Sequence, residues 1–81
     1  MENEFKEEMQ CVVTFQTTTE AMAFEEAAKA AGFCGRMIPL PTAIAAGCGL
    51  VWRDDPKCRG AIERLLRESR LGHDKIYDLV I

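Results

Sequence analysis

The stretch that determines the fold is residues 48–66, CGLVWRDDPKCRGAIERLL. Its beginning, Cys48–Arg53, contains Leu, Val and Trp in succession and predicts a strand. Asp54-Asp55-Pro56 predicts the start of a helix, because Asp is a favoured N-cap and Pro fits the first helical position, where its missing N–H is not needed. An apolar stripe at helical spacing follows, formed by Cys58, Ile62, Leu65 and Leu66.

The first half of the chain shows the same succession of strand and helix. Cys11–Phe15 predicts a strand, and Thr17-Thr18-Thr19-Glu20 supplies hydroxyl N-caps and an early acid for a helix. Gly32 is placed to close that helix in the left-handed conformation. Further strands are predicted at Arg36–Ile38, before two prolines, and at Lys75–Ile81, after Gly72 ends the second helix.

The resulting order is strand, helix, strand, strand, helix, strand, which is typical of a ferredoxin-like split βαβ domain. We therefore expect an α+β fold with a four-stranded antiparallel sheet in the order 4-1-3-2 and two helices on one face. In this arrangement, the strand that starts at Cys48 begins at the end of the sheet where Cys11–Phe15 finishes. Cys48 would then lie beside the start of the first helix.

Length and charge limit the classes of function. The chain has 81 residues and a net charge of −3. Residues 1–9 contain four Glu and one Lys, which accounts for all of that charge. We expect an acidic N-terminal tail over 1–9, whose order the sequence leaves open, and a single neutral domain over 10–81. Such a domain lacks the Lys/Arg surplus of a strongly basic nucleic-acid binder.

The sequence also indicates a cellular compartment. Met1–Gln10 is acidic and lacks the apolar core of a secretory signal. Met37–Trp52 is free of charge but too short to span a membrane, and prolines and glycines interrupt it. We therefore expect a cytoplasmic protein with reduced thiols and no membrane partner.

Cys48 is the candidate nucleophile among the four cysteines. At the start of a helix, free N–H groups and the positive end of the dipole stabilise an anion such as a thiolate. Gly47 and Gly49 leave the sulfur open to approach, and nearby hydroxyls are candidate donors to it. The structural alternative is that Cys48 is a small buried hydrophobe and that its glycines serve turns. The candidate donors are Thr17, Thr18 and Thr19.

The other three cysteines are expected at the opposite end of the sheet. Cys11 is expected to be packed or at an edge, Cys34 to lie in a loop, and Cys58 to lie on the apolar stripe. No Cys-x-x-Cys pair occurs, so the sequence predicts no metal site. A disulfide framework is not expected either, because such frameworks belong to oxidising compartments. No Cys-His or Ser-His-Asp arrangement and no phosphate-binding loop is visible. These absences favour an accessory protein over a turnover enzyme, and no cofactor is expected.

Three segments together resemble the selenium/sulfur carrier-like family of small bacterial and archaeal proteins. They are Val13-Thr14-Phe15 followed by threonines, Arg36-Met37-Ile38-Pro39-Leu40-Pro41, and Cys48-Gly49-Leu50-Val51-Trp52-Arg53. The resemblance implies that Cys48 carries sulfur or selenium transiently, as a persulfide or perselenide. It also implies a donor such as a cysteine desulfurase, and an acceptor enzyme. The further family positions that it implies are Thr18, Arg36, Pro39, Pro41 and Gly49.

Two other functions remain open at this stage. One is a non-catalytic interaction module, in which the face of the sheet without helices forms a homodimer or binds a partner. Apolar residues on both sides of the Cys48–Arg53 strand are compatible with a covered second face. The other is a thiol-redox sensor, in which Cys48 would need an intermolecular partner because the other thiols lie at the far end.

Overall fold

The computed structural model describes residues 8–42, 44 and 47–80. It confirms the predicted succession of strands and helices. The expected tail lies largely outside the described residues, although the first strand already begins at Met9. The elements are β1 (Met9–Thr14), α1 (Thr18–Ala30), β2 (Arg36–Pro39), β3 (Leu50–Asp54), the short 3-10 helix η2 (Pro56–Cys58), α2 (Arg59–Glu68) and β4 (Ile76–Val80).

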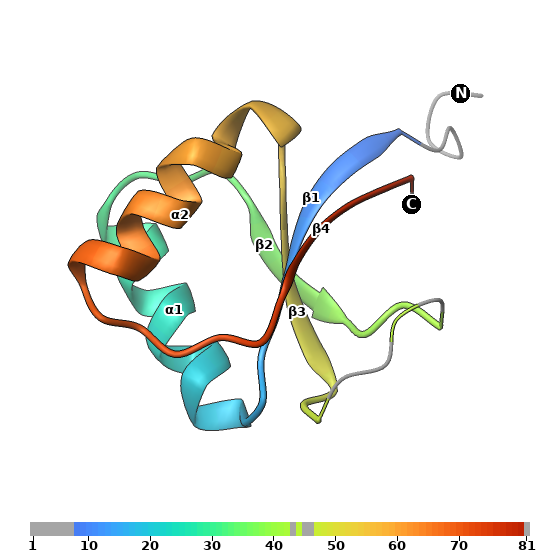
Figure 1. Ribbon diagram of the computed structural model, residues 1–81, viewed down its shortest axis with the longest axis horizontal. Helices are drawn as coiled ribbons and strands as arrows, with labels where there is room; N and C mark the ends of the chain where they lie inside the picture. The colour runs from blue at the N-terminus through green and yellow to red at the C-terminus, as the bar shows by residue number, and fades with distance from the viewer. Residues whose placement is uncertain (1–7, 43, 45–46, 81) are drawn as a thin grey trace.

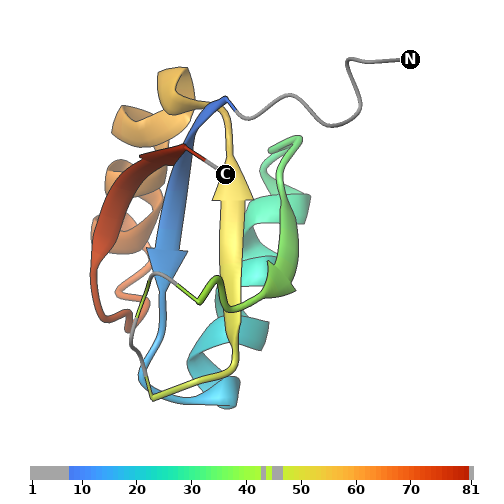
Figure 2. The same cartoon turned by 90° about the vertical axis from the view of Figure 1, so that its right-hand side faces the viewer.

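The domain is an α+β structure with a four-stranded sheet in the order β2-β3-β1-β4. Every pair of neighbouring strands is antiparallel. From the β4 edge this is the order 4-1-3-2, and Figure 2 shows the strands side by side in it. Both α1 and α2 lie on one side of the sheet (Figure 1). No helix of the described residues has the length and apolar character needed to cross a membrane.

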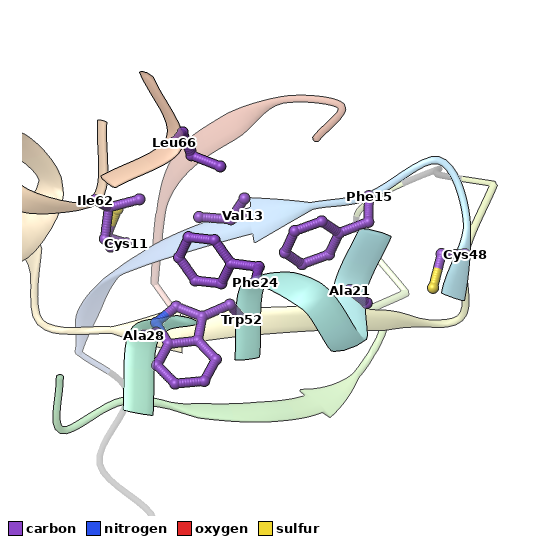
Figure 3. Packing of buried hydrophobic residues seen from close by; sticks show 10 residues of the cluster. All are labelled: Cys11, Val13, Phe15, Ala21, Phe24, Ala28, Cys48, Trp52, Ile62 and Leu66. Carbon is purple, nitrogen blue, oxygen red and sulfur yellow. The ribbon is translucent and has the colours of Figure 1, made fainter. Parts of the chain in front are cut away.

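Aromatic side chains form the centre of the core between sheet and helices. The ring centroid of Phe24 on α1 lies 5.6 Å from that of Phe15 and 5.4 Å from that of Trp52 on β3. All three side chains are fully buried. Figure 3 shows them between α1 and the strands. The apolar stripe of α2 packs into the same cluster through Ile62 and Leu66, as its spacing predicts.

A second, smaller cluster covers the opposite face of the sheet. Val12 on β1 and Val51 on β3 are fully buried there, under Ile44 of the segment that follows β2. Strand alternation explains the two clusters, because successive side chains point to opposite faces. This sheet face is therefore occupied in part by the chain itself. The partly buried residues around it are Ile38, Leu40, Tyr77 and Leu79.

The predicted N-caps are present at both helical segments. The Thr17 hydroxyl accepts a hydrogen bond from the N–H of Glu20 at 3.1 Å, and the Glu20 carboxylate accepts one from the N–H of Gln16 at 2.9 Å. Asp55 accepts from the N–H of Lys57 at 2.8 Å, with Pro56 directly after the cap. The second helix differs from the prediction in one respect, because its first turn is the 3-10 helix η2.

The two helices end differently. Gly32 has a φ of +86° after α1, as predicted. After α2 the left-handed residue is Arg70, with a φ of +53°, and not Gly72. The N–H of Leu71 donates to Leu66 O at 3.0 Å, and Leu71 packs against the core. This apolar contact fixes the end of α2 before the glycine is reached, as in a Schellman motif. Gly72 lies instead against the Glu20 carboxylate.

Arg70→Gly is therefore expected to stabilise the protein. A non-glycine residue pays a steric cost in the left-handed region, and its removal should raise the free energy of unfolding by about 0.5–1 kcal/mol. The matched control is Arg67→Gly inside α2, which should lower it by about 1 kcal/mol. Urea denaturation measures both changes, and equal effects of the two variants would contradict this account of the helix end.

Candidate functional site

Cys48 lies where the sequence predicts, at the end of the sheet where β1 leads into α1. Its N–H donates a hydrogen bond to Phe15 O at 3.3 Å. Figure 3 shows it at one end of the buried cluster and Cys11 at the other. Cys48 is not itself in a strand, as β3 begins two residues later at Leu50. The backbone before β3 also pairs with the residue that follows β2, since the N–H of Leu40 donates to Gly49 O at 2.9 Å.

One of the three candidate hydroxyls contacts the sulfur. The Thr18 Oγ1 lies 3.8 Å from the Cys48 Sγ, within the distance of a sulfur hydrogen bond, and either atom could donate. Thr17 uses its hydroxyl as the N-cap of α1, and Thr19 is exposed on α1. With the sulfur as thiolate, the Thr18 hydroxyl would be the donor, because a thiolate can only accept.

The sequence leaves the exposure of Cys48 open, and the structure has it buried, because its residue is 4% exposed and belongs to the main buried cluster. The helix start beside it also carries an acid, since Glu20 lies in the first turn of α1. A negative charge in that turn offsets the dipole that would stabilise a thiolate. The site thus combines a hydroxyl contact and a helix terminus with a thiol that is closed off in this conformation.

The two glycines beside Cys48 have different roles. A Cβ on Gly47 would lie 2.9 Å from Gln16 O, closer than real side chains approach a backbone oxygen. Gly47 therefore permits the close approach of two backbone segments. A Cβ on Gly49 would meet nothing within 4 Å. Both glycines are exposed, so the surface next to the thiol is open on the Gly49 side.

Alanine at these two positions should separate the two roles. Gly47→Ala is expected to lower the free energy of unfolding by about 1–3 kcal/mol, because Gln16 O belongs to the backbone and must shift. Gly49→Ala should change it by less than about 0.5 kcal/mol, since it adds a methyl group in open space. Thermal denaturation of both variants measures the difference, and equal losses would refute the assignment.

The family positions outside the Cys-Gly pair do not all gather at Cys48. Pro39 is opposite Leu50 in the sheet register, at the same end as the thiol. Pro41 follows closely and accepts a hydrogen bond from the N–H of Ile44 at 3.1 Å. Arg36 instead lies at the other end of β2, opposite Arg53. Antiparallel pairing therefore places Arg36 at the end of the sheet remote from the thiol.

The remaining cysteines lie at that far end, as predicted. Cys11 is opposite Asp54 in the register and is fully buried. Burial raises its pKa from 9.0 to about 11, and the nearby Asp78 carboxylate adds to the effect. Partial burial, followed by the Asp54 carboxylate, raises the pKa of Cys58. Cys34 is exposed. Within residues 8–42, 44 and 47–80, no cluster of three or more potential ligands could hold a metal ion.

Asp54 is a buried carboxylate that the sequence did not predict. Its Oδ2 accepts a hydrogen bond from the Trp52 indole N–H at 3.1 Å, and its Oδ1 accepts one from the N–H of Asp55 at 2.8 Å. The sequence signal was present, because Trp52 and Asp54 are two residues apart on one strand and share a face. The position before Asp55-Pro56 instead favours a helix cap.

The pKa of Cys11 predicts a loss of stability at alkaline pH. The folded protein binds the Cys11 thiol proton more tightly than the unfolded chain. The contribution of this group to the free energy of unfolding is therefore full below pH 9 and is lost as the pH rises towards about 11. The loss should be on the order of 2 kcal/mol. Urea denaturation across this range measures it, with Cys11→Val as the control that lacks the thiol. Parallel pH profiles of the two proteins would contradict the prediction.

One family model matches nearly the whole domain, including the segment with Cys48. The family model described as "Putative Se/S carrier protein-like" matches residues 10–78, from β1 into β4. The chain belongs to this family. The match confirms the resemblance predicted from the Cys48-Gly49 and Arg36–Pro41 segments. No curated protein and no solved structure matches this Se/S carrier-like chain.

Proposed function

We propose that this Se/S carrier-like protein is a cytoplasmic carrier that holds a single sulfur or selenium atom on Cys48. The observation that carries the proposal is the family match over residues 10–78, which includes the Cys48-Gly49 pair. The position of the thiol at the start of α1, within 3.8 Å of the Thr18 hydroxyl, supports it. We also assign the fold to the ferredoxin-like class, on the support of its strand order and paired helices.

The proposed step is a transfer of sulfane sulfur between thiols. The Cys48 thiolate attacks the outer sulfur of a persulfide on a donor such as a cysteine desulfurase. A bond forms between Cys48 Sγ and that sulfur, the S–S bond of the donor breaks, and the donor cysteine leaves as a thiolate. Cys48 becomes a persulfide, and the reverse exchange passes the atom to an acceptor enzyme. The balance is the same for selenium, and no further oxidant or reductant is needed.

Loading requires the thiol to become accessible. Cys48 is 4% exposed, so the segment that carries it has to open towards the donor. The hydrogen bond from its N–H to Phe15 O, at 3.3 Å, is long and therefore weak. The open surface beside Gly49 is the side on which a donor can approach. We therefore expect the donor protein to open the site on contact.

The distribution of the thiols favours a carrier over a redox sensor. Cys11 and Cys58 lie at the far end of the sheet, and Cys34 lies with Asp54 at that end. A persulfide on Cys48 therefore has no resolving thiol nearby within the described residues. The bound atom leaves to another molecule and is not released through an internal disulfide.

The test is mass spectrometry of the intact protein after incubation with a cysteine desulfurase and L-cysteine. We expect a gain equal to one sulfur atom, removed by a reducing thiol and absent in Cys48→Ser. The matched control is Cys34→Ser, which removes the exposed thiol and should load normally. Loading on Cys34 alone, or no loading with several donors, would refute the carrier function.

A second candidate is an interaction module in which Cys48 is structural. The burial of the thiol favours it, because a fully packed cysteine behaves as a small hydrophobe. In this case Cys48→Ala would leave all partner binding intact. Pull-down with the purified desulfurase would give the same result for the variant and the wild type. Persulfide formation on Cys48 in the preceding experiment excludes this alternative.

A further inference from the structure

Two arginines face each other at the end of the sheet remote from Cys48. In the antiparallel register, Arg36 on β2 is directly opposite Arg53 on β3. Side chains in such a pair share a face with Cβ atoms about 5 Å apart, and like charges in this position repel. Among residues 8–42, 44 and 47–80, neither guanidinium has a carboxylate within ion-pair distance. The repulsion between the two arginines is therefore not offset within the described residues, and a bound anion would reduce it.

A cavity of about 210 Å³ lies at this pair. Its lining includes Gln10 of β1 and the thiol-bearing Cys34. Gly35 is required for its shape, because a Cβ there would overlap Arg53 O and the Asp54 carboxyl group. The register places Gln10, Arg36 and Arg53 on the face of the sheet that the helices do not cover, since Arg53 is opposite Val12 and alternates with Trp52.

The two acids in the lining do not neutralise the arginines by contact. Asp54 alternates with Arg53 and so points to the helix side, where its carboxylate accepts from the Trp52 indole and from the N–H of Asp55. Asp55 accepts from the N–H of Lys57 as the N-cap of η2. Both carboxylates are thus held by donors of the β3–η2 segment, and the guanidinium groups remain the donors available to a ligand.

We propose that this cavity binds a small oxyanion between Arg36 and Arg53. A guanidinium presents a planar fork of N–H donors that matches the oxygen spacing of phosphate, sulfate and carboxylate groups. Two forks on neighbouring strands can share one such anion, and the Gln10 amide adds a further donor. The ligand would lie beside Cys34, at the opposite end of the sheet from Cys48. The proposal is therefore independent of the carrier function.

The experiment is a titration of the full-length protein with inorganic phosphate at constant ionic strength, followed by the NMR signals of the Cys34 and Gly35 amides. The full-length chain is used, so that its acidic residues 1–7 are present. We expect saturable shifts that chloride does not produce. Sulfate and acetate serve as competitors. Displacement of phosphate by acetate would show that the site also binds carboxylates, and displacement by sulfate alone would show that it binds tetrahedral oxyanions only.

Variants test the role of the arginines. Arg53→Gln and Arg36→Gln should each weaken phosphate binding about tenfold or more, as expected for the loss of charged hydrogen bonds. Arg36→Lys should fall between these variants and the wild type, because it keeps the charge and loses the fork. Arg64→Gln on the exposed side of α2 is the control and should bind normally. Cys48→Ser should also bind normally.

A second measurement does not depend on the NMR signals. Phosphate should raise the melting temperature of the wild type. Arg53→Gln should melt higher than the wild type in chloride and respond to phosphate only at higher concentrations. Shifts that stay linear and equal to those of chloride would overturn the proposal. Phosphate binding that is unchanged in both arginine-to-glutamine variants would also overturn it.

Discussion

The packing of Phe24 between Phe15 and Trp52 is the interaction on which the rest of the structure depends. Phe24 and Trp52 meet at an interplanar angle of 71°, the edge-on geometry that aromatic pairs favour, and Phe15 and Phe24 meet at 46°. This contact joins the residue that follows β1 to α1 and to β3. Phe15 also supplies the carbonyl that accepts from Cys48, and Thr17 caps α1 two residues later. The position of the candidate thiol is therefore a consequence of aromatic packing.

Asp54 has the corresponding role at the other end of β3. A carboxylate that is 4% exposed is tolerated because the Trp52 indole and a backbone N–H donate to it. Partial burial and, after it, the negative charge of Asp54 raise the pKa of the Cys58 thiol. The two ends of β3 thus differ in chemistry. One end has a thiol next to a hydroxyl and a helix start, and the other has acids on one face of the sheet and arginines on the other.

Much of the fold could be predicted from the sequence because its signals are local. Asp55-Pro56 and Thr17-Glu20 fix helix starts through contacts within a few residues, and Gly32 fixes a helix end through its φ. The end of α2 could not be predicted in this way, because Leu71 ends it through a tertiary contact with the core and leaves the left-handed position to Arg70.

The candidate site could be predicted in its location and not in its exposure. Topology alone brings Cys48 to the start of α1, and the structure has it there. Its burial depends on how the segment before β3 packs against Phe15 and Ala21, which no local pattern indicates. The distance of Arg36 from the thiol likewise depends on antiparallel register, although Arg36 and Cys48 are close in sequence.

The bonds around Thr14 have a consequence for the order in which the protein forms. Thr14 exchanges backbone hydrogen bonds with Asp74 and Lys75, and its hydroxyl accepts from the N–H of Lys75, across 60 residues of chain or more. β1 is an inner strand whose second neighbour, β4, comes last among the described strands. During synthesis, one edge of β1 therefore stays unpaired until β4 has left the ribosome. Contacts this distant in sequence slow folding, and an open strand edge is a template for association between nascent chains.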